Sequence, residues 1–147
     1  SVWLTDVSTD ALDVARANLA GIGRAAANVR ISHGDWYAAL PESLVGNIDV
    51  IVANPPYIAS GDPEVEASVM AYEPHEALFA AEEGLAALRV IVAGAHTWLR
   101  ADGALVLEIG YRQGDAVRTL CANAGLCDIE VRRDLAGRER IVVARTN

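Results

Sequence analysis

Hydrophobic residues follow two different spacings along the chain, and each spacing predicts a different kind of element. Short apolar runs are typical of buried strands, whereas apolar residues that recur every three or four positions are typical of helices. Largely apolar runs predict strands at residues 2–5, 48–53, 104–109 and 141–144, and apolar residues interrupted by polar ones predict strands at residues 29–33 and 129–133. The helical spacing predicts one helix that begins at Ser8 or Thr9 and is stopped by Gly21 and Gly23, a second over residues 82–100 and a third over residues 114–124.

The order of these elements predicts the fold class. Strands and helices alternate along most of the chain, which indicates an α/β sheet with helices on both faces. The continuous apolar run at residues 48–53 is expected to form a central parallel strand that is buried on both faces. The last two strands flank a short turn at Ala136 and Gly137, so they are expected to form an antiparallel hairpin. The length of 147 residues suits a single domain.

Polar residues follow several of the predicted strands. Asp6, Asp35 and Asn54 each come after an apolar run, and Glu108 lies near the end of another. Because α/β sheets bind ligands beyond the carboxyl ends of their parallel strands, we expect these residues to lie along one edge. The carboxylate of Asp6 can accept hydrogen bonds from both hydroxyls of a ribose, or it can simply cap the following helix. The local sequence leaves both interpretations open.

Asp35 and Trp36 are a second candidate pair. A carboxylate can accept a hydrogen bond from an exocyclic amine, and an aromatic ring can cover the face of a purine. Taken in isolation, the pair is better explained as a turn aspartate beside a core tryptophan.

The most informative motif is Asn54-Pro55-Pro56-Tyr57, which ends the apolar run of residues 48–53. Proline lacks a backbone donor and has a fixed φ, so this segment is rigid before any ligand binds. The Asn54 side-chain oxygen and the Asn54 and Pro55 carbonyls can therefore present acceptors in fixed positions. Such acceptors suit a planar NH₂ group, which has two donors, and the ring of Tyr57 can pack on the same group.

This arrangement would solve a specific chemical problem. An amide or aryl amine is a poor nucleophile because its lone pair is delocalised. Acceptors that hold both hydrogens can orient the nitrogen toward an electrophile and stabilise the positive charge that develops on it. As a four-residue pattern alone, however, the motif is also compatible with a chance turn.

Composition narrows the possible partners. The formal net charge is −8, and the basic residues are scattered arginines apart from a loose cluster between Arg132 and Arg145. This charge argues against a nucleic-acid substrate, since phosphate contacts require a basic surface. No apolar run has the roughly 18 residues of a membrane span, and no signal peptide is evident. The two cysteines are expected to be reduced in a cytoplasmic protein, and the three histidines form no metal motif.

Together, the motifs resemble a known family. Asp6, Asp35-Trp36 and the N-P-P-Y motif, at these spacings, look like class I methyltransferases that use S-adenosylmethionine (SAM). N-P-P-Y alone also occurs in adenine-N6 DNA methyltransferases and in some guanine-N2 rRNA methyltransferases. Further motifs across the chain are similar to the PrmC/HemK family of release-factor glutamine methyltransferases. They are Tyr57-Ile58, Tyr72-Glu73-Pro74 with Ala77-Leu78, Ala80-Ala81-Glu82-Glu83-Gly84, Leu107-Glu108-x-Gly110, Gln113-Gly114-x-Ala116-Val117, and Arg132-Arg133-Asp134 with Glu139-Arg140.

The resemblance implies a fold, a reaction and a set of site residues. Enzymes of this family methylate the side-chain nitrogen of the glutamine in the Gly-Gly-Gln motif of peptide-chain release factors in the cytoplasm, with SAM as methyl donor. The implied SAM ligands are Asp6 for the ribose, Asp35 and Trp36 for the adenine, and Asn54. The implied catalytic residues are Asn54, Pro55 and Tyr57. The implied substrate-binding residues are these three together with Pro56, Glu73 and Pro74.

The sequence also departs from the family pattern. The family carries a first strand and a glycine-rich G-x-G-x-G loop ahead of the position of Asp6, and a small helical N-terminal domain before that. Neither is present here, so residues 1–147 are expected to form a partial Rossmann-like methyltransferase domain.

This departure leaves two alternatives open. One is an amino-methyltransferase of the N-P-P-Y type that acts on DNA adenine or rRNA guanine. The other is a non-catalytic fragment that cannot bind SAM alone.

Overall fold

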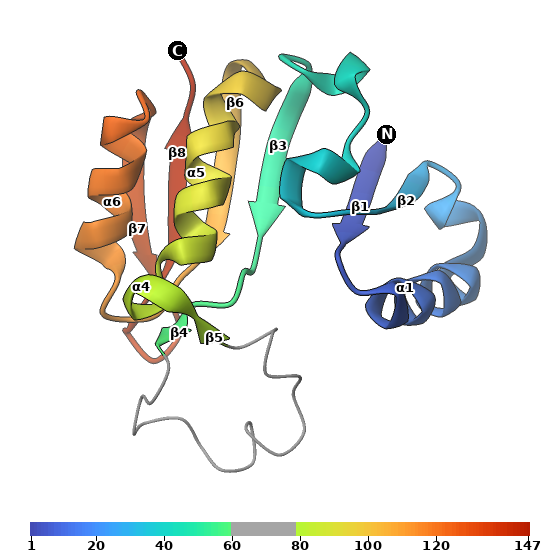
Figure 1. Cartoon of the computed structure of the whole chain (residues 1–147), viewed down its shortest axis with the longest axis horizontal. Helices are drawn as coiled ribbons and strands as arrows, with labels where there is room; N and C mark the ends of the chain where they lie inside the picture. The colour runs from blue at the N-terminus through green and yellow to red at the C-terminus, as the bar shows by residue number, and fades with distance from the viewer. Residues whose placement is uncertain (60–78) are drawn as a thin grey trace. The chain divides into compact units, whose positions relative to one another are not determined.

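A computed structural model describes residues 1–59 and 79–147 of the chain (Figure 1). The chain divides into two compact units, Ser1–Leu44 and Val45–Asn147, and each is described by itself.

The first unit is a strand–helix–strand motif. Strand β1 (Val2–Asp6) pairs in parallel with β2 (Val29–His33), and helix α1 (Thr9–Ile22) connects them. Ser8 caps α1 as predicted, because its hydroxyl accepts a hydrogen bond from the backbone N–H of Ala11 at 3.2 Å. Three short 3₁₀ helices complete the unit: η1 (Gly23–Ala26), η2 (Trp36–Ala39) and η3 (Glu42–Leu44).

The second unit contains a mixed four-stranded sheet in the order β3-β6-β8-β7. Its strands are β3 (Ile48–Ala53), β6 (Leu99–Glu108), β7 (Cys127–Arg133) and β8 (Glu139–Arg145). The β3–β6 pair is parallel, whereas β8 runs antiparallel to both β6 and β7. The C-terminal hairpin predicted from the sequence is therefore confirmed, as is the α/β class.

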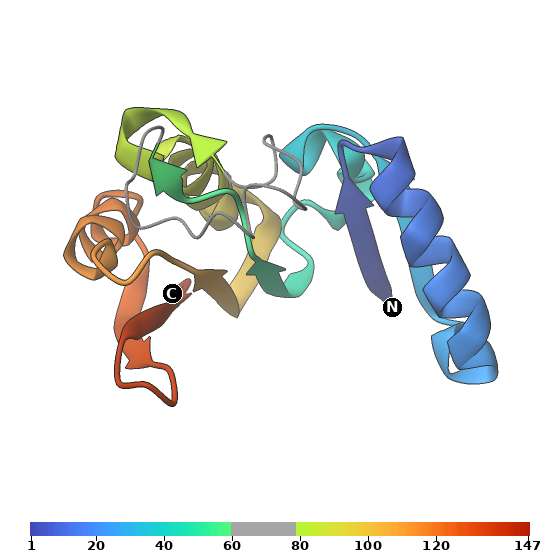
Figure 2. The ribbon, with the colours of Figure 1, turned by 90° about the horizontal axis from the view of Figure 1, so that it is seen from below.

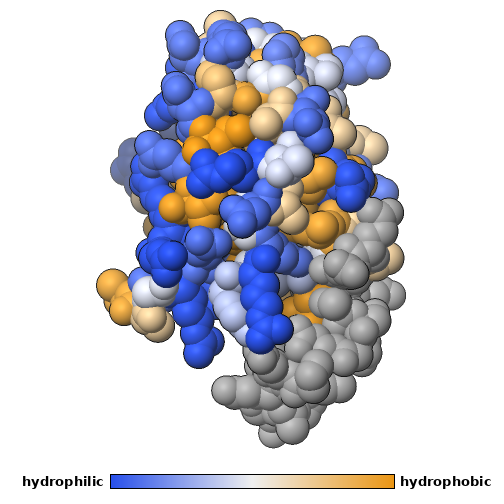
Figure 3. Space-filling model, turned by 90° about the vertical axis from the view of Figure 1, so that its left-hand side faces the viewer, coloured by the Kyte–Doolittle hydropathy of each residue, from blue (hydrophilic) through white to orange (hydrophobic). Residues whose placement is uncertain are grey.

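Helices α5 (Ala86–Trp98) and α6 (Gly114–Asn123) lie side by side on one face of this sheet (Figures 1 and 2). The short helix α4 (Ala81–Gly84) precedes α5, and two-residue strands β4 (Ile58–Ala59) and β5 (Phe79–Ala80) pair in parallel. Apolar side chains from the two long helices and the sheet face beneath them form the core. They are Leu88, Ile91, Val92, Ala95, Leu105, Leu107, Val117, Cys121, Val142 and Ala144. On the side of the molecule that carries α6 and β7, mostly hydrophilic residues surround small apolar areas (Figure 3).

Two predictions about this unit are wrong. Strand β3 has the predicted bounds, but it is not buried on both faces, because Val50 and Val52 are 52% and 73% exposed. Within the described sheet, β3 pairs with β6 alone and occupies an edge. The predicted helix over residues 82–100 is in fact two helices that separate at Leu85, and the second ends at Trp98.

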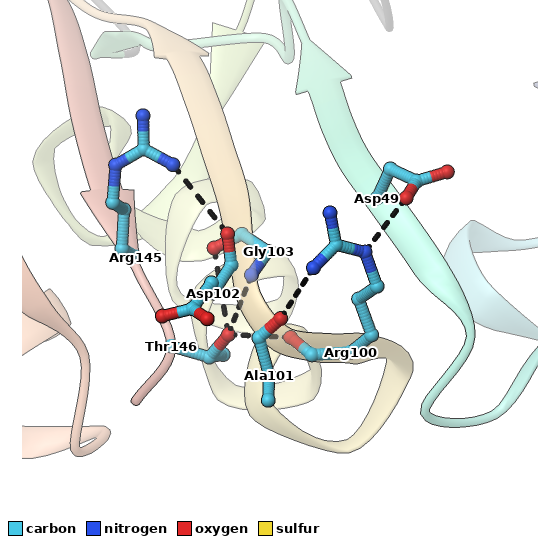
Figure 4. A network of polar contacts seen from close by, with 7 residues as sticks. All are labelled: Asp49, Arg100, Ala101, Asp102, Gly103, Arg145 and Thr146. Atoms are coloured by element: carbon cyan, nitrogen blue, oxygen red, sulfur yellow. Dashed lines mark hydrogen bonds and ion pairs between the residues drawn. The ribbon is translucent and has the colours of Figure 1, made fainter.

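A polar network joins the amino-terminal end of β6 to the C-terminal segment (Figure 4). Thr146 is buried, with only 4% of its surface exposed. Its hydroxyl donates to the Arg100 carbonyl at 2.6 Å and accepts from the Gly103 N–H at 3.0 Å. Arg100 in turn pairs with Asp49 of β3 at 2.7 Å, and this hydrogen bond holds the pKa of the Asp49 carboxyl below its usual value. Asp102 takes a left-handed φ of 58° within this bend. The network therefore stabilises an irregular part of β6 that pairing with β3 does not cover.

Candidate functional site

Residues 54–57, hereafter the N-P-P-Y loop, follow β3 directly. Pro55 and Pro56 end the strand because neither nitrogen can donate to a sheet ladder. Pro55 is buried, whereas Asn54 is exposed and its side chain makes no hydrogen bond to a described residue. The loop therefore combines a fixed backbone with an amide side chain that is available to a ligand.

The backbone of Tyr57 is held by the segment that follows β6. Gln113 donates from Nε2 to the Tyr57 carbonyl oxygen at 3.0 Å, and its Oε1 accepts from the Gly110 N–H at 2.9 Å. Gly84, which has a φ of 84°, packs against the same carbonyl. A Cβ atom at this position would lie 2.7 Å from the Gln113 amide nitrogen and 2.8 Å from the Tyr57 carbonyl carbon. Glycine is required here both for its conformation and for its small size.

The side chain of Tyr57 is held by two charged residues. Its hydroxyl donates to Glu108 Oε1 at 2.8 Å and accepts from Arg140 Nη1 at 3.3 Å. The same Arg140 nitrogen donates to the Ile109 carbonyl at 3.2 Å, and the Arg140 Nε atom lies 3.7 Å from Asp134 Oδ2. All these side chains are half-buried, so they are partly shielded from competing water.

The electrostatics of Tyr57 follow from these neighbours. Burial, together with the hydrogen bond to Glu108 and its negative charge, raises the pKa of Tyr57, whereas Arg140 lowers it. The net shift is upward, so the phenol is neutral at physiological pH and cannot serve as a general base.

In the first unit, Asp6 stabilises the turn that leads into α1. Its Oδ1 accepts from the Ser8 N–H at 2.8 Å, and its backbone carbonyl accepts from the Gly34 N–H at 3.1 Å. His33 Nε2 lies 2.9 Å from the Val7 carbonyl oxygen and ties the ends of the two strands together. Asp6 thus holds the turn that precedes α1, whereas the N-cap of the helix is Ser8, and this contact occupies one carboxylate oxygen of Asp6 only. Oδ2 has no partner in residues 1–59 or 79–147.

Asp35 and Trp36 lie just beyond β2. Asp35 precedes η2, and its exposed carboxylate makes no capping hydrogen bond there. Trp36 is half-buried rather than part of the core, and its φ of 45° is unusual for a residue with a side chain. An exposed aspartate before η2 is compatible with the turn interpretation, whereas the half-buried Trp36 is not the core tryptophan that this interpretation expected.

The structure therefore places the predicted site residues that it describes in two groups. Residues 54–57 form one loop in the second unit, and Asp6, Asp35 and Trp36 lie at strand ends in the first. Glu73 and Pro74 lie outside the described residues. The ligand-binding roles of all these residues remain predictions.

Further expectations concern metals, cysteines and membranes. Over the described ranges, no group of three or more metal-ligating side chains comes together. Both cysteines are free thiols. None of the helices in the described part of the chain has the length and apolar character needed to cross a membrane.

Little in the sequence indicated the residues that hold Tyr57. Glu108 was recognisable only as a polar residue near a strand end, and Gln113 and Arg140 only as parts of motifs. Only their positions could have indicated a role. Glu108 ends β6, Gln113 follows shortly after it, and Arg140 lies on β8, which pairs with β6. Adjacent strands bring residues distant in sequence to one edge.

Comparison with solved structures defines the class of fold. A methyltransferase from Pyrococcus furiosus superposes with a TM-score of 0.67 at 16% identity, over all of this chain and 63% of that one. A ribosomal protein L11 methylase from Lactobacillus delbrueckii subsp. bulgaricus gives a TM-score of 0.64 at 19% identity, over all of this chain and 58% of that one. The chain therefore has the fold of class I methyltransferases.

Comparison with curated proteins is more specific. The chain is 49% identical over 142 residues to a release factor glutamine methyltransferase from Burkholderia pseudomallei (strain K96243). The aligned residues cover 95% of this chain and 49% of that protein. It is 44% identical over 144 residues to the protein of the same name from Xylella fastidiosa (strain 9a5c), covering 98% of this chain and 50% of that one. The chain thus spans about half the length of these relatives. No family model matches it. The resemblance to release-factor glutamine methyltransferases expected from the motifs is confirmed.

Proposed function

We propose that the protein containing this chain transfers a methyl group from SAM to the side-chain nitrogen of the glutamine in the Gly-Gly-Gln motif of peptide-chain release factors. The observation that carries the proposal is the N-P-P-Y loop, whose two prolines and held Tyr57 leave the Asn54 amide exposed at the end of β3. The similarity to release factor glutamine methyltransferases supports a glutamine amide as the planar NH₂ group. Because release factors act in translation, the proposal places the protein in the cytoplasm.

The residues of the first unit suit a SAM molecule in chemical terms. Asp6 retains one carboxylate oxygen that can accept from the ribose hydroxyls, and the Asp35 carboxylate can accept from the adenine amine. The half-buried ring of Trp36 offers an aromatic surface to the base. When bound, SAM supplies a methyl group on a positively charged sulfur, which keeps the electron pair when the carbon–sulfur bond breaks.

The N-P-P-Y loop would act by positioning the acceptor. The Asn54 side-chain oxygen and the Pro55 carbonyl would accept the two N–H groups of the glutamine, which aims its nitrogen at the methyl carbon. As the new nitrogen–carbon bond forms, the nitrogen becomes positively charged, and these acceptors stabilise that charge. The nitrogen then loses one proton to water. The neutral Tyr57 contributes its ring face, and no strong base is required.

Transfer of labelled methyl groups from SAM tests this proposal. The full-length gene product should label a release factor that carries Gly-Gly-Gln but not one whose glutamine is changed to alanine. An Asn54→Ala variant should lose most of this activity, whereas Asn47→Ala, an exposed asparagine before β3, should retain it. Equal labelling of the two release factors would disprove the proposed substrate, as would labelling of DNA or rRNA in preference to both.

The SAM ligands can be tested separately by calorimetry. Asp6→Ala should weaken SAM binding by about tenfold or more, since a charge-assisted hydrogen bond is worth roughly 1.5–3 kcal/mol. Asp10→Ala removes a carboxylate from the first turn of α1 and provides the control. Equal SAM affinity of the two variants would exclude Asp6 as a ligand.

A further inference from the structure

The side chain of Tyr57 is unusual among the residues of the N-P-P-Y loop, because its hydroxyl is turned toward the protein. The hydroxyl has one hydrogen to donate, and Glu108 Oε1 accepts it at 2.8 Å. Arg140 Nη1 donates to the same oxygen at 3.3 Å. The single donor and one acceptor position of the phenol are therefore already used.

The partners of Tyr57 are themselves held in place. Glu108 is the last residue of β6, and its Cα partner across the sheet is Ile141, the neighbour of Arg140 in β8. Arg140 also donates to the Ile109 carbonyl, and its Nε lies 3.7 Å from Asp134. Glu108 and Arg140 thus project from two hydrogen-bonded strands of the four-stranded sheet, which fixes the backbone positions of both residues.

The charges of the pair also fit this arrangement. Glu108 and Arg140 have opposite signs, and the phenol lies between them as a neutral link that donates to one and accepts from the other. Hydrogen bonds to charged groups are stronger than those between neutral groups. The ring is therefore fixed more firmly than packing alone would achieve.

From these contacts we infer that Glu108 and Arg140 are positioning residues for methyl transfer, which act on the reaction only by fixing the ring of Tyr57. The inference rests on the proposed function and deepens it. Tyr57 then contacts the substrate amide with its ring face alone, and its hydroxyl serves the protein. Neither Glu108 nor Arg140 touches the substrate.

A titration that requires no methyl transfer tests the anchoring of Tyr57. Glu108 raises the pKa of Tyr57 and Arg140 lowers it, so Glu108→Gln and Arg140→Gln should shift this pKa in opposite directions. The ¹³Cζ resonance of Tyr57, followed by NMR against pH, reports the shift. Glu130→Gln and Arg132→Gln alter an exposed pair on β7 and should leave the pKa unchanged. A general loosening of the fold would instead move both test variants the same way, toward ordinary tyrosine, and would overturn the inference.

A double-mutant cycle in the full-length enzyme tests the consequence for transfer. Tyr57→Phe keeps the ring and removes the hydroxyl, so it should lower kcat by about ten- to a hundredfold, the scale expected for a reacting group misplaced by about 1 Å. Glu108→Gln should cause a similar loss, with little change in KM for the release factor. The double variant should be no slower than the slower single variant, because both changes break the same connection.

The two experiments separate the possible failures. Losses that multiply in the double variant would show that Glu108 acts independently of Tyr57 and would overturn the inference. Opposite pKa shifts without any transfer to a Gly-Gly-Gln release factor would leave the anchoring intact and disprove the proposed substrate, and with it the positioning role.

Discussion

Replacing Gly84 with alanine is expected to disturb the N-P-P-Y loop from a position outside it. The new Cβ atom would overlap the Tyr57 carbonyl oxygen and would lie 2.7 Å from the Gln113 amide nitrogen. It would therefore intrude on the hydrogen bond that joins Gln113 to Tyr57. Either the loop or helix α4 must move to relieve the overlap.

The size of the effect can be worked out from three contributions. Placing a residue with a Cβ atom at a φ of 84° lowers the free energy of unfolding by roughly 1–2 kcal/mol. Weakening the Gln113–Tyr57 hydrogen bond costs a further ~1 kcal/mol. Alanine also reduces the conformational entropy of the unfolded chain, which raises the free energy of unfolding by about 0.4–1 kcal/mol. We expect Gly84→Ala to lower the free energy of unfolding by about 2 kcal/mol in total, with loss of transfer activity as the loop shifts.

Substitution of a second glycine measures the cost of the backbone conformation without any steric overlap. Gly46 has a similar φ of 68°, but a Cβ atom there would meet nothing within 4 Å. Gly46→Ala should therefore cost only about 1 kcal/mol and leave transfer unchanged. Urea unfolding followed by circular dichroism compares the variants, and a difference of ~1 kcal/mol corresponds to roughly 0.5 M urea at the midpoint. If Gly84→Ala unfolds at the same midpoint as Gly46→Ala and retains full activity, the proposed packing around Tyr57 is incorrect.

Three further predictions concern stability and reactivity. Thr146→Val should lower the free energy of unfolding by about 1–3 kcal/mol in thermal denaturation, because it leaves the buried partners of the hydroxyl unpaired; an unchanged melting temperature would contradict this. Burial raises the pKa of Cys121 to about 11, so at pH 8 a thiol reagent should modify Cys127 well before Cys121 in the native protein; equal rates would argue against the described core. Val52→Lys, at a position 73% exposed, should unfold within about 0.5 kcal/mol of the parent protein, whereas Val142→Lys, at 1% exposed, should fail to fold.

The elements that the sequence predicted well are those fixed by local chemistry. Strands β2 and β3 have the predicted bounds because the turn residues Gly34 and Asp35 end the first and two prolines end the second. Helix α1 begins where Ser8 can cap it and ends at Ile22, just before Gly23, whose φ is 66°. In each case the deciding residues are adjacent in the sequence, so no knowledge of the tertiary structure was needed.

The start of β6 could not be predicted because the local signal is ambiguous. Asp102 and Gly103 suggest the end of a helix, but here they belong to a bend within the strand. The register with β3 moves from Ile48 opposite Leu99 to Val50 opposite Ala104 across this bend. Thr146, which is distant in the sequence, supplies the hydrogen bonds that make the bend stable.

The same distinction between local and distant residues applies to the candidate site. The N-P-P-Y loop was recognisable because four adjacent residues carry its chemistry. The residues that hold it were not, because Glu108, Gln113 and Arg140 reach Tyr57 only through the strand order of the sheet. Composition and periodicity carry no information about which side chains meet across that order.

This arrangement also has a consequence for folding. The β7–β8 hairpin joins neighbouring segments and can form early, since local contacts close small loops. The hydrogen bonds to Tyr57 span 51, 56 and 83 residues of sequence, so they close large loops and carry the greatest entropic cost. We therefore expect the N-P-P-Y loop to become ordered late in folding, after the sheet that supports it has formed. A nascent or partly folded chain would then have much of its core but not yet the geometry needed to act on a substrate.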